Sequence, residues 1–385
     1  MPLINTNPQL IESLKSIEHT DFVTIDTEFI REKTFWAKLC LIQIATRDKV
    51  ILIDPLAENI NLQPFFDLMQ NKKILKIFHS ARQDIEIIYH LSKIIPEPIY
   101  DTQIAAMICG YNDSISYEKL VSDICKKNLS KASRFSNWEN RPLSAQQLEY
   151  AEYDVTYLVD IYLYLKNKIE QQNRQTWGDD ELAILTDKNT YDSSPELAWH
   201  KIKYNFKKSK EKSILQNLAF WRECLAQTNN VPRSHILKDE ILIDIAQQQP
   251  KTINSLFKLR RFPLNSLQKK LYAEDIINCV KNSTDQIIDD LPKIKKYKNF
   301  PSELQGKLEI LKLLLKIIGE QEKVAPRLIA SVADLEKFIL AKDKSESKLF
   351  QGWRKKIFGA KATKLLNGQL ALKINNNKIE FFTNN

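Results

Sequence analysis

The chain has 385 residues, a length typical of two or three domains, and 43% of its residues are hydrophobic, enough to form real cores. Only seven glycines argue against folds that bind nucleotides through glycine-rich loops. No apolar run approaches the roughly eighteen residues that a membrane span needs, and MPLINTNPQLIESL lacks the basic patch and apolar core of an export signal. Five scattered cysteines without a CxxC pair predict reduced thiols and argue against a zinc site. We therefore expect a cytoplasmic protein that does not bind membranes.

The net charge of +9 is unevenly distributed along the chain. Residues 1–165 hold 17 Lys and Arg against 22 Asp and Glu, a balance of −5, whereas the remaining 220 residues hold 40 against 26, a balance of +14. An acidic front half joined to a basic rear half indicates metal-dependent chemistry in one part and binding of a polyanion in the other. Lysine-rich helical surfaces that only keep the protein soluble explain the basic half equally well.

Residues 1–165 alternate between predicted strands and helices. FVTIDTEFI alternates apolar and polar residues as a half-buried strand does, and LCLIQIAT and KVILIDP follow closely, as in an antiparallel meander. The later predicted elements are a helix over 62–69, a strand over 73–78, a helix over 80–91 with Ser80 as its N-cap, a strand over 98–101, a helix over 102–109 and a long helix capped by Ser144. This order predicts a mixed sheet with helices on its faces.

The remainder of the chain has helical periodicity after a polar connector. Two helical modules show a weak internal similarity. In each, a long helix is followed by a tripeptide, Val231–Arg233 or Ala325–Arg327, and then by another helix. Only the tail LALKINNNKIEFF has weak β character. We expect four segments: an α/β domain over 1–168, a connector over 169–205, and all-α modules over 206–291 and 292–385.

Acidic residues in apolar surroundings mark three stretches of the α/β domain. Asp26 and Glu28 lie two apart on a predicted strand, so they share one face while Thr27 faces the other way. An exposed strand surface explains one acid. Two acids on the same face fit a metal site better, because buried carboxylates need partners.

The other two stretches lie on predicted helices. Asp84 is in the first turn of its helix, where an acid stabilises the helix dipole by itself; it also lies near the carboxyl end of a strand, where α/β folds gather ligands. Tyr150 and Asp154 are four apart and share a helix face. Tyr150 alone is typical of a core tyrosine, but beside the acids it could orient an attacking water. The acids together indicate two divalent metals clamping a phosphodiester, hence hydrolysis of a nucleic-acid strand.

Longer motifs carry a resemblance to a known family. IDTEF, HSARQD and YAEYD resemble, in order, the three motifs of DEDD-superfamily exonucleases, in the subclass that bears a tyrosine. TFWAKLCLIQIAT, VPRSHILKDEIL and LFQGWRKKIFG resemble ribonuclease D, so the similarity covers nearly the full length. The resemblance implies an RNase H-like fold for the first domain and two helicase-and-RNase-D C-terminal (HRDC) domains behind it. LAFWRECLAQTNNVPR fits the first of these, and the second is more divergent.

The resemblance also implies a role for each acid. Asp26, Glu28 and Asp154 would hold one metal ion, Asp26 would bridge to a second, and Asp84 would assist through the outer shell. Glu28 would also contact the terminal 3′-hydroxyl, and Tyr150 would position the attacking water. The cofactors would be two divalent ions, Mg²⁺ or Mn²⁺.

The leading prediction is a 3′→5′ exoribonuclease that releases 5′-mononucleotides from RNA 3′ ends, as in tRNA maturation, with tRNA precursors as its partners and no stable protein partner. A DNA 3′→5′ exonuclease is an alternative, because nothing in the site motifs separates the sugars. A second alternative is a catalytically silent RNA-binding adaptor, against which the five intact site residues count.

Other residues have competing explanations. For His79, a helix-entry histidine satisfied by the backbone is favoured over contact with phosphate, and Asp101 resembles a strand end and helix cap. Phe29, Phe35 and Trp36 are candidates for stacking on terminal bases, although core packing explains Phe29 equally well. Some of the basic runs are expected to contact phosphates: Lys207–Lys212, Arg260–Arg261, Lys293–Lys298 and Arg354–Lys356.

Overall fold

The structure is a computed structural model that describes residues 3–129, 136–204, 208–262, 271–283, 300–341, 343–376 and 378–383. The chain divides into two compact units. The first comprises Met1–Glu28, Leu39–Thr190 and Tyr297–Asn385, and the second comprises Phe29–Lys38 and Tyr191–Lys296. The run Lys293–Lys298 and part of the run at 207–212 lie outside the described residues.

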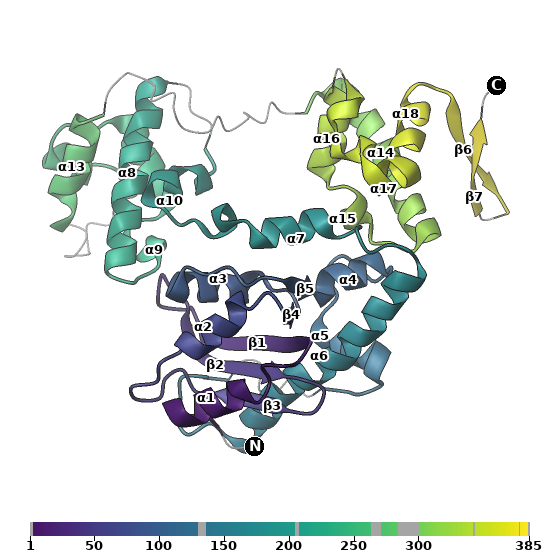
Figure 1. Cartoon of the computed structure of the whole chain (residues 1–385). Helices are drawn as coiled ribbons and strands as arrows, with labels where there is room; N and C mark the ends of the chain where they lie inside the picture. Colours follow the sequence, from purple (N-terminus) through teal and green to yellow (C-terminus); the bar gives the residue numbers. More distant parts are fainter. Residues whose placement is uncertain are drawn as a thin grey trace. The chain divides into compact units, whose positions relative to one another are not determined.

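A five-stranded mixed sheet forms the centre of the first unit (Figure 1). Its order is β3-β2-β1-β4-β5, so the three strands of the predicted meander are neighbours. β2 and β3 are antiparallel, whereas β1 pairs in parallel with β4 and β4 with β5. The bounds are β1 Phe22–Ile30, β2 Lys38–Ala45, β3 Val50–Ile53, β4 Leu75–Phe78 and β5 Ile99–Asp101. The predicted mixed sheet is therefore confirmed.

Four helices accompany this sheet close to their predicted positions: α2 Gln63–Gln70, α3 Arg82–Ser92, α4 Thr102–Ile108 and α6 Ala145–Gln171. Three further helical segments were not predicted: α1 Asn7–Lys15, α5 Tyr117–Leu120 and the π-helical turn Val121–Cys125. The expected N-cap of α3 is wrong. The helix begins after Ala81, Ser80 has a left-handed φ of 63°, and the Asp101 carboxylate accepts hydrogen bonds from the backbone N–H groups of Ser80 and Ala81.

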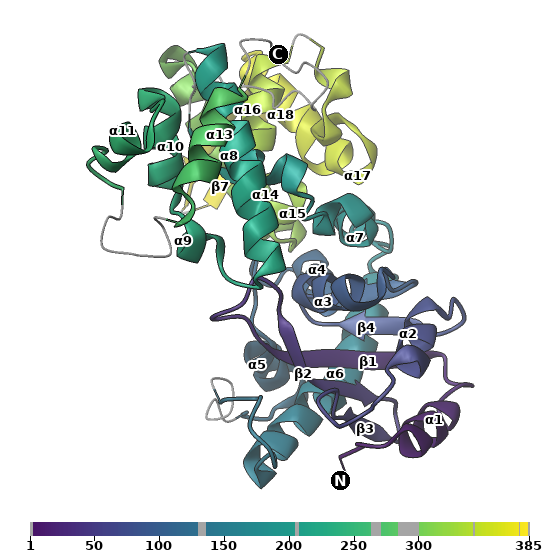
Figure 2. The ribbon, with the colours of Figure 1, turned by 90° about the vertical axis from the view of Figure 1, so that its left-hand side faces the viewer.

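The long helix α6 packs against the sheet (Figures 1 and 2). It begins with a capping box between Ser144 and Gln147, as the sequence predicted for Ser144. Its buried side chains meet residues such as Phe22 on the sheet. The Thr24 hydroxyl donates to the backbone carbonyl of Val155 at 2.8 Å. Because Thr24 is fully buried, this contact sets the register of α6 against β1.

A bidentate ion pair fixes the chain segment that leads into α6. The Arg141 guanidinium donates through Nε and Nη2 to the two Asp54 carboxylate oxygens, at 2.7 and 2.6 Å. The same group donates to the backbone carbonyls of Cys40 and Trp138. Planar two-point pairs of this kind hold geometry as well as contributing energy. The start of α6 is thereby tied to the ends of β2 and β3.

The C-terminal helices belong to the same unit as the sheet. They are α14 Gln305–Glu322, α15 Pro326–Ile329, α16 Val332–Leu340, α17 Gly352–Arg354 and α18 Ala360–Leu366, with short 3₁₀ or π turns at Ser302–Leu304, Lys344–Glu346, Lys348–Phe350 and Lys355–Gly359. The weakly β-like tail forms an antiparallel hairpin of β6 (Leu370–Asn375) and β7 (Lys378–Thr383).

Close backbone contacts join these helices to the α/β domain. The Ala325 N–H donates to the Met107 carbonyl at 2.9 Å, and the Arg174 guanidinium donates to the Glu322 carbonyl at 2.7 Å. Gly110 has a φ of +88°, and a Cβ there would come within 2.6 Å of the Lys323 carbonyl oxygen. Only glycine combines this conformation with so close an approach.

The segment after α6 is held by aromatic and ionic contacts. Trp177 stacks on Trp353 with ring centroids 4.2 Å apart and planes 5° from parallel. Arg354, which is only 4% exposed, pairs with Asp180 and Glu181 on α7 (Asp179–Thr186) and donates to the Leu328 carbonyl. Arg354 was predicted as part of a basic run; its burial gives it a structural role.

The second unit is helical in its described part from Tyr191 onward. Its elements are the 3₁₀ helix Pro195–Lys201, α8 Ser209–Thr228, α9 Arg233–Ile236, α10 Asp239–Gln248, α11 Ile253–Phe257 and α13 Ala273–Lys281; a 3₁₀ turn, Lys188–Tyr191, precedes them. A core centred on α8 unites them, with Leu215, Leu218, Leu242 and Ile276 fully buried.

The segment between β1 and β2 packs within this second unit. The Asn230 side-chain oxygen accepts hydrogen bonds from the backbone N–H groups of Phe35 and Trp36, at 3.1 and 3.0 Å. Phe35 is 5% exposed, lies against Ala226, and has the Arg233 guanidinium 4.6 Å above its ring. Phe35 therefore serves packing and is not available to stack on a base.

None of the helices in the described part of the chain combines the length and apolar character that crossing a bilayer requires. All five cysteines are free thiols, as their spacing predicted.

We predict that Arg354→Met lowers the free energy of unfolding by about 3–5 kcal/mol, because it leaves the partly buried Glu181 without its cation. Burial already raises the pKa of Glu181, against the opposing effect of Arg354. Calorimetry should show the loss as a lower melting temperature. Asp180→Asn is the matched control, since that side chain is 63% exposed and its loss should have little effect. Equal melting temperatures for the two variants would contradict this role for Arg354.

Candidate active site

Strand β1 presents its two acids on the face covered by α6. Side chains alternate along a strand, so Asp26 and Glu28 lie on the same side as Phe22 and Thr24, both of which contact α6 or its core cluster. Thr27 points to the opposite face, as predicted, and its hydroxyl donates to the Asp84 carboxylate at 2.5 Å. The strand thus contacts acidic residues from helices on both sides of the sheet.

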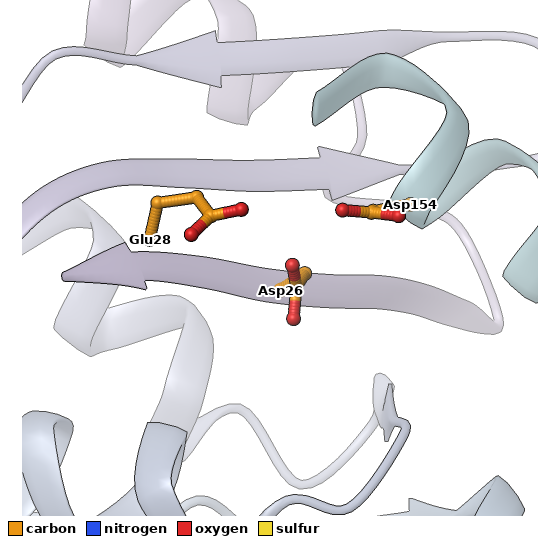
Figure 3. Close-up of side chains that lie close together, drawn as sticks. All are labelled: Asp26, Glu28 and Asp154. Carbon is orange, nitrogen blue, oxygen red and sulfur yellow. The ribbon is translucent and has the colours of Figure 1, made fainter. Parts of the chain in front are cut away.

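Three carboxylates converge between β1 and α6. One oxygen each from Asp26, Glu28 and Asp154 lies within 4.8 Å of the others, and Figure 3 shows the three side chains facing a common space. Asp154 comes from α6, one residue before the Val155 carbonyl that anchors the helix to Thr24. Residues separated by more than 120 positions in the sequence therefore meet.

Asp84 lies beside this group but is not one of the three converging residues. It is 6% exposed on the first turn of α3. Burial and the neighbouring Asp26 raise the pKa of Asp84, and the Thr27 hydroxyl partly offsets that rise. Burial and the Asp154 carboxylate likewise raise the pKa of Asp26. The site therefore concentrates negative charge where water cannot fully screen it.

Tyr150 lies one helical turn before Asp154 and is half-buried. Burial, followed by the carboxylates of Asp154, Glu28 and Asp26, raises the pKa of Tyr150 far above that of a free phenol. The hydroxyl therefore stays protonated and can donate a hydrogen bond. The ring of the buried Trp138 lies beside it, with centroids 6.1 Å apart.

Two nearby polar residues have structural roles. His79 bonds through Nδ1 to the Thr102 hydroxyl at 3.0 Å, and burial lowers its pKa. Asp101 accepts from the backbone N–H groups of Gln103 and Ile104 at the start of α4. Asp101 caps its helix as predicted. His79 is held by the Thr102 side chain in addition to the expected backbone contact, which is with Ile115. Thr27 was not expected as the partner of Asp84; its only signal in the sequence is its position between two acids.

We predict that Asp84→Asn raises the melting temperature of the metal-free protein at about pH 8. A carboxyl whose pKa is raised by folding contributes stability that is lost as pH rises through the raised pKa. The uncharged amide of Asn at position 84 does not titrate, so the variant avoids this loss. The gain should shrink toward about pH 4, where the wild-type carboxyl is protonated. Melting curves in chelator at both pH values provide the test.

Asp101→Asn serves as the control, because it removes a carboxylate that accepts four backbone N–H bonds, and should lower the melting temperature at about pH 8. A lower melting temperature for Asp84→Asn at that pH would contradict the repulsion inferred here.

Comparisons with known proteins identify the family of the chain. A family model described as 3′-5′ exonuclease matches residues 2–170, and one described as HRDC domain matches residues 211–280. Curated relatives named ribonuclease D, from Bartonella henselae and Nitrobacter hamburgensis, are 46% and 42% identical over 98% of this chain, covering 93% and 98% of the relatives.

A solved structure supports the fold. The crystal structure of Escherichia coli RNase D, described as an exoribonuclease involved in structured RNA processing, superposes with a TM-score of 0.81 at 24% identity. The match covers 95% of this chain and 98% of that one. With a 3′-5′ exonuclease domain, an HRDC domain and full-length relatives of one name, the chain belongs to the ribonuclease D family and is a 3′→5′ exoribonuclease, a hydrolase that acts on RNA.

Proposed function

We propose that Asp26, Glu28 and Asp154 form the catalytic centre and hold divalent metal ions, two in number and either Mg²⁺ or Mn²⁺. The observation that carries this proposal is the approach of three carboxylate oxygens to within 4.8 Å of one another. Oxygen-only ligands suit these hard cations. A cation would also neutralise the charge that raises the pKa of Asp26. The three carboxylates are therefore suitable ligands for divalent metal ions.

Each acid has a distinct proposed role. Asp26, Glu28 and Asp154 would hold one ion, Asp26 would also reach the second, and Asp84 would act through the outer shell while Thr27 orients it. Glu28 would in addition contact the terminal 3′-hydroxyl of the RNA. When bound, two such ions lower the pKa of an attacking water and stabilise the leaving 3′-oxygen.

Tyr150 would position the attacking water by donating a hydrogen bond to it. A donor is needed here, because the surrounding carboxylates only accept when ionised. The raised pKa of Tyr150 keeps that proton in place at physiological pH.

The natural substrates would be RNAs with a free 3′ end, tRNA precursors in particular, in the cytoplasm and without a stable protein partner. We also propose the domain limits 1–168, 169–205, 206–291 and 292–385, with the last segment a second, divergent HRDC domain. Its support is a matching helix order: α8, α9 and α10 have 20, 4 and 10 residues, and α14, α15 and α16 have 18, 4 and 9.

Incubation of a 3′-extended tRNA precursor with Mg²⁺, with and without chelator, tests the proposed function. Release of 5′-mononucleotides only with metal is the expected result. A DNA oligonucleotide of matched sequence should be degraded more slowly. Metal-independent product would contradict the proposed chemistry.

Asp26→Asn and Asp154→Asn should each reduce kcat by about a thousandfold or more, because each removes a proposed metal ligand. Both proteins should stay folded by circular dichroism. Asp48→Asn, an exposed acid on the loop after β2, is the control and should retain wild-type kcat. Near-wild-type turnover in either site variant would rule out the proposed centre.

Tyr150→Phe should lower kcat by about 10²–10³-fold while leaving metal affinity unchanged, since only the hydroxyl that orients water is lost. Single-turnover kinetics and a metal titration separate the two effects. Tyr153→Phe is the matched control on the same helix, because that hydroxyl bonds instead to Glu149 at 3.0 Å. Similar rates for both variants would argue against a role for Tyr150.

A further inference from the structure

We propose that Gln43 is a positioning residue for the metal site, its side-chain amide donating a hydrogen bond to the Asp26 carboxylate when that carboxylate holds metal. The inference rests on the proposed function. Gln43 lies on β2 and is 0% exposed. Within the described residues, neither its Nε2 nor its Oε1 has a hydrogen-bond partner.

Fold stability does not explain an amide at this position. A buried amide left without hydrogen bonds costs about 1–3 kcal/mol. The side chains two positions away on either side, Leu41 and Ala45, are apolar and equally buried. A leucine at 43 would continue that surface without an unsatisfied polar group. The glutamine therefore indicates a functional partner for its amide, one that the fold by itself does not require.

Two contacts place Gln43 beside Asp26. The Arg47 guanidinium lies 5.5 Å from the Phe22 ring, and the Thr24 hydroxyl lies 3.3 Å from the Ala45 carbonyl. Two residues forward along β1 thus correspond to two residues backward along β2, which is an antiparallel register. One further step pairs Asp26 with position 43.

Both side chains also face the same way. Phe22 and Ala45 belong to one buried cluster under α6, and alternation carries this face to Asp26 on β1 and to Gln43 on β2. Side chains directly opposite on neighbouring strands have Cβ atoms about 4.5–5.5 Å apart. The flexible glutamine amide can therefore reach the aspartate carboxylate.

The chemistry of the pair favours a neutral donor. Carboxylates that bind metals are themselves commonly held by hydrogen bonds from an outer group. A lysine or arginine at position 43 would bring a positive charge that competes with the metal ions. An amide N–H orients the Asp26 carboxylate and leaves its negative charge to the metal.

The test is Gln43→Leu, with Mn²⁺ binding measured by calorimetry in the absence of RNA. We expect Mn²⁺ affinity to fall about 10–100-fold, with the melting temperature in chelator equal to or above wild type. The variant should also lose exoribonuclease activity, and high Mn²⁺ should restore that activity with an unchanged KM for RNA. Gln216→Leu on α8, which also removes a buried amide Nε2 without a partner in the described chain, is the control and should bind Mn²⁺ like wild type.

Unchanged Mn²⁺ affinity in Gln43→Leu, at any melting temperature, would overturn the inference while leaving the proposed metal site intact. A wild-type protein that binds no Mn²⁺ would instead overturn the proposed site itself.

Discussion

Repulsion among the carboxylates of Asp26, Asp154 and Asp84 is the constraint on which the rest of the site depends. Burial and mutual proximity raise the pKa of Asp26 and of Asp84, so the fold holds these groups in an arrangement that they would not adopt alone. A divalent cation would replace this repulsion with attraction, because carboxylates that repel one another all attract the cation. In the centre proposed here, the same geometry that weakens the bare protein would create affinity for metal. Crowded acids would then lower stability in exchange for function.

The scaffold withstands this repulsion through contacts that add no negative charge. The buried Thr24 hydroxyl locks α6 one residue from Asp154, the Thr27 hydroxyl orients Asp84, and Arg141 anchors the entry to α6 through Asp54. Each of these links joins segments far apart in the sequence. Replacing Asp26 or Asp154 should leave all three links in place, which separates catalytic loss from unfolding.

Local periodicity made much of the fold and site predictable. The two-residue alternation on β1 gave the shared face of Asp26 and Glu28, and the four-residue spacing on α6 paired Tyr150 with Asp154. Long-range side-chain contacts were not predictable. Asp101 supports the approach to α3 in place of the expected Ser80 cap, and Arg354 is buried in an ion pair despite lying in a basic run. Such partners depend on tertiary packing, which short sequence patterns do not encode.

The most direct measurement of the central claim is a crystal structure of the wild-type protein grown with Mn²⁺, with ions located by their anomalous scattering. Convergence of Asp26, Glu28 and Asp154 on metal predicts anomalous peaks about 2–2.4 Å from their carboxylate oxygens. Well-ordered carboxylates with Mn²⁺ bound only elsewhere on the protein would contradict the claim.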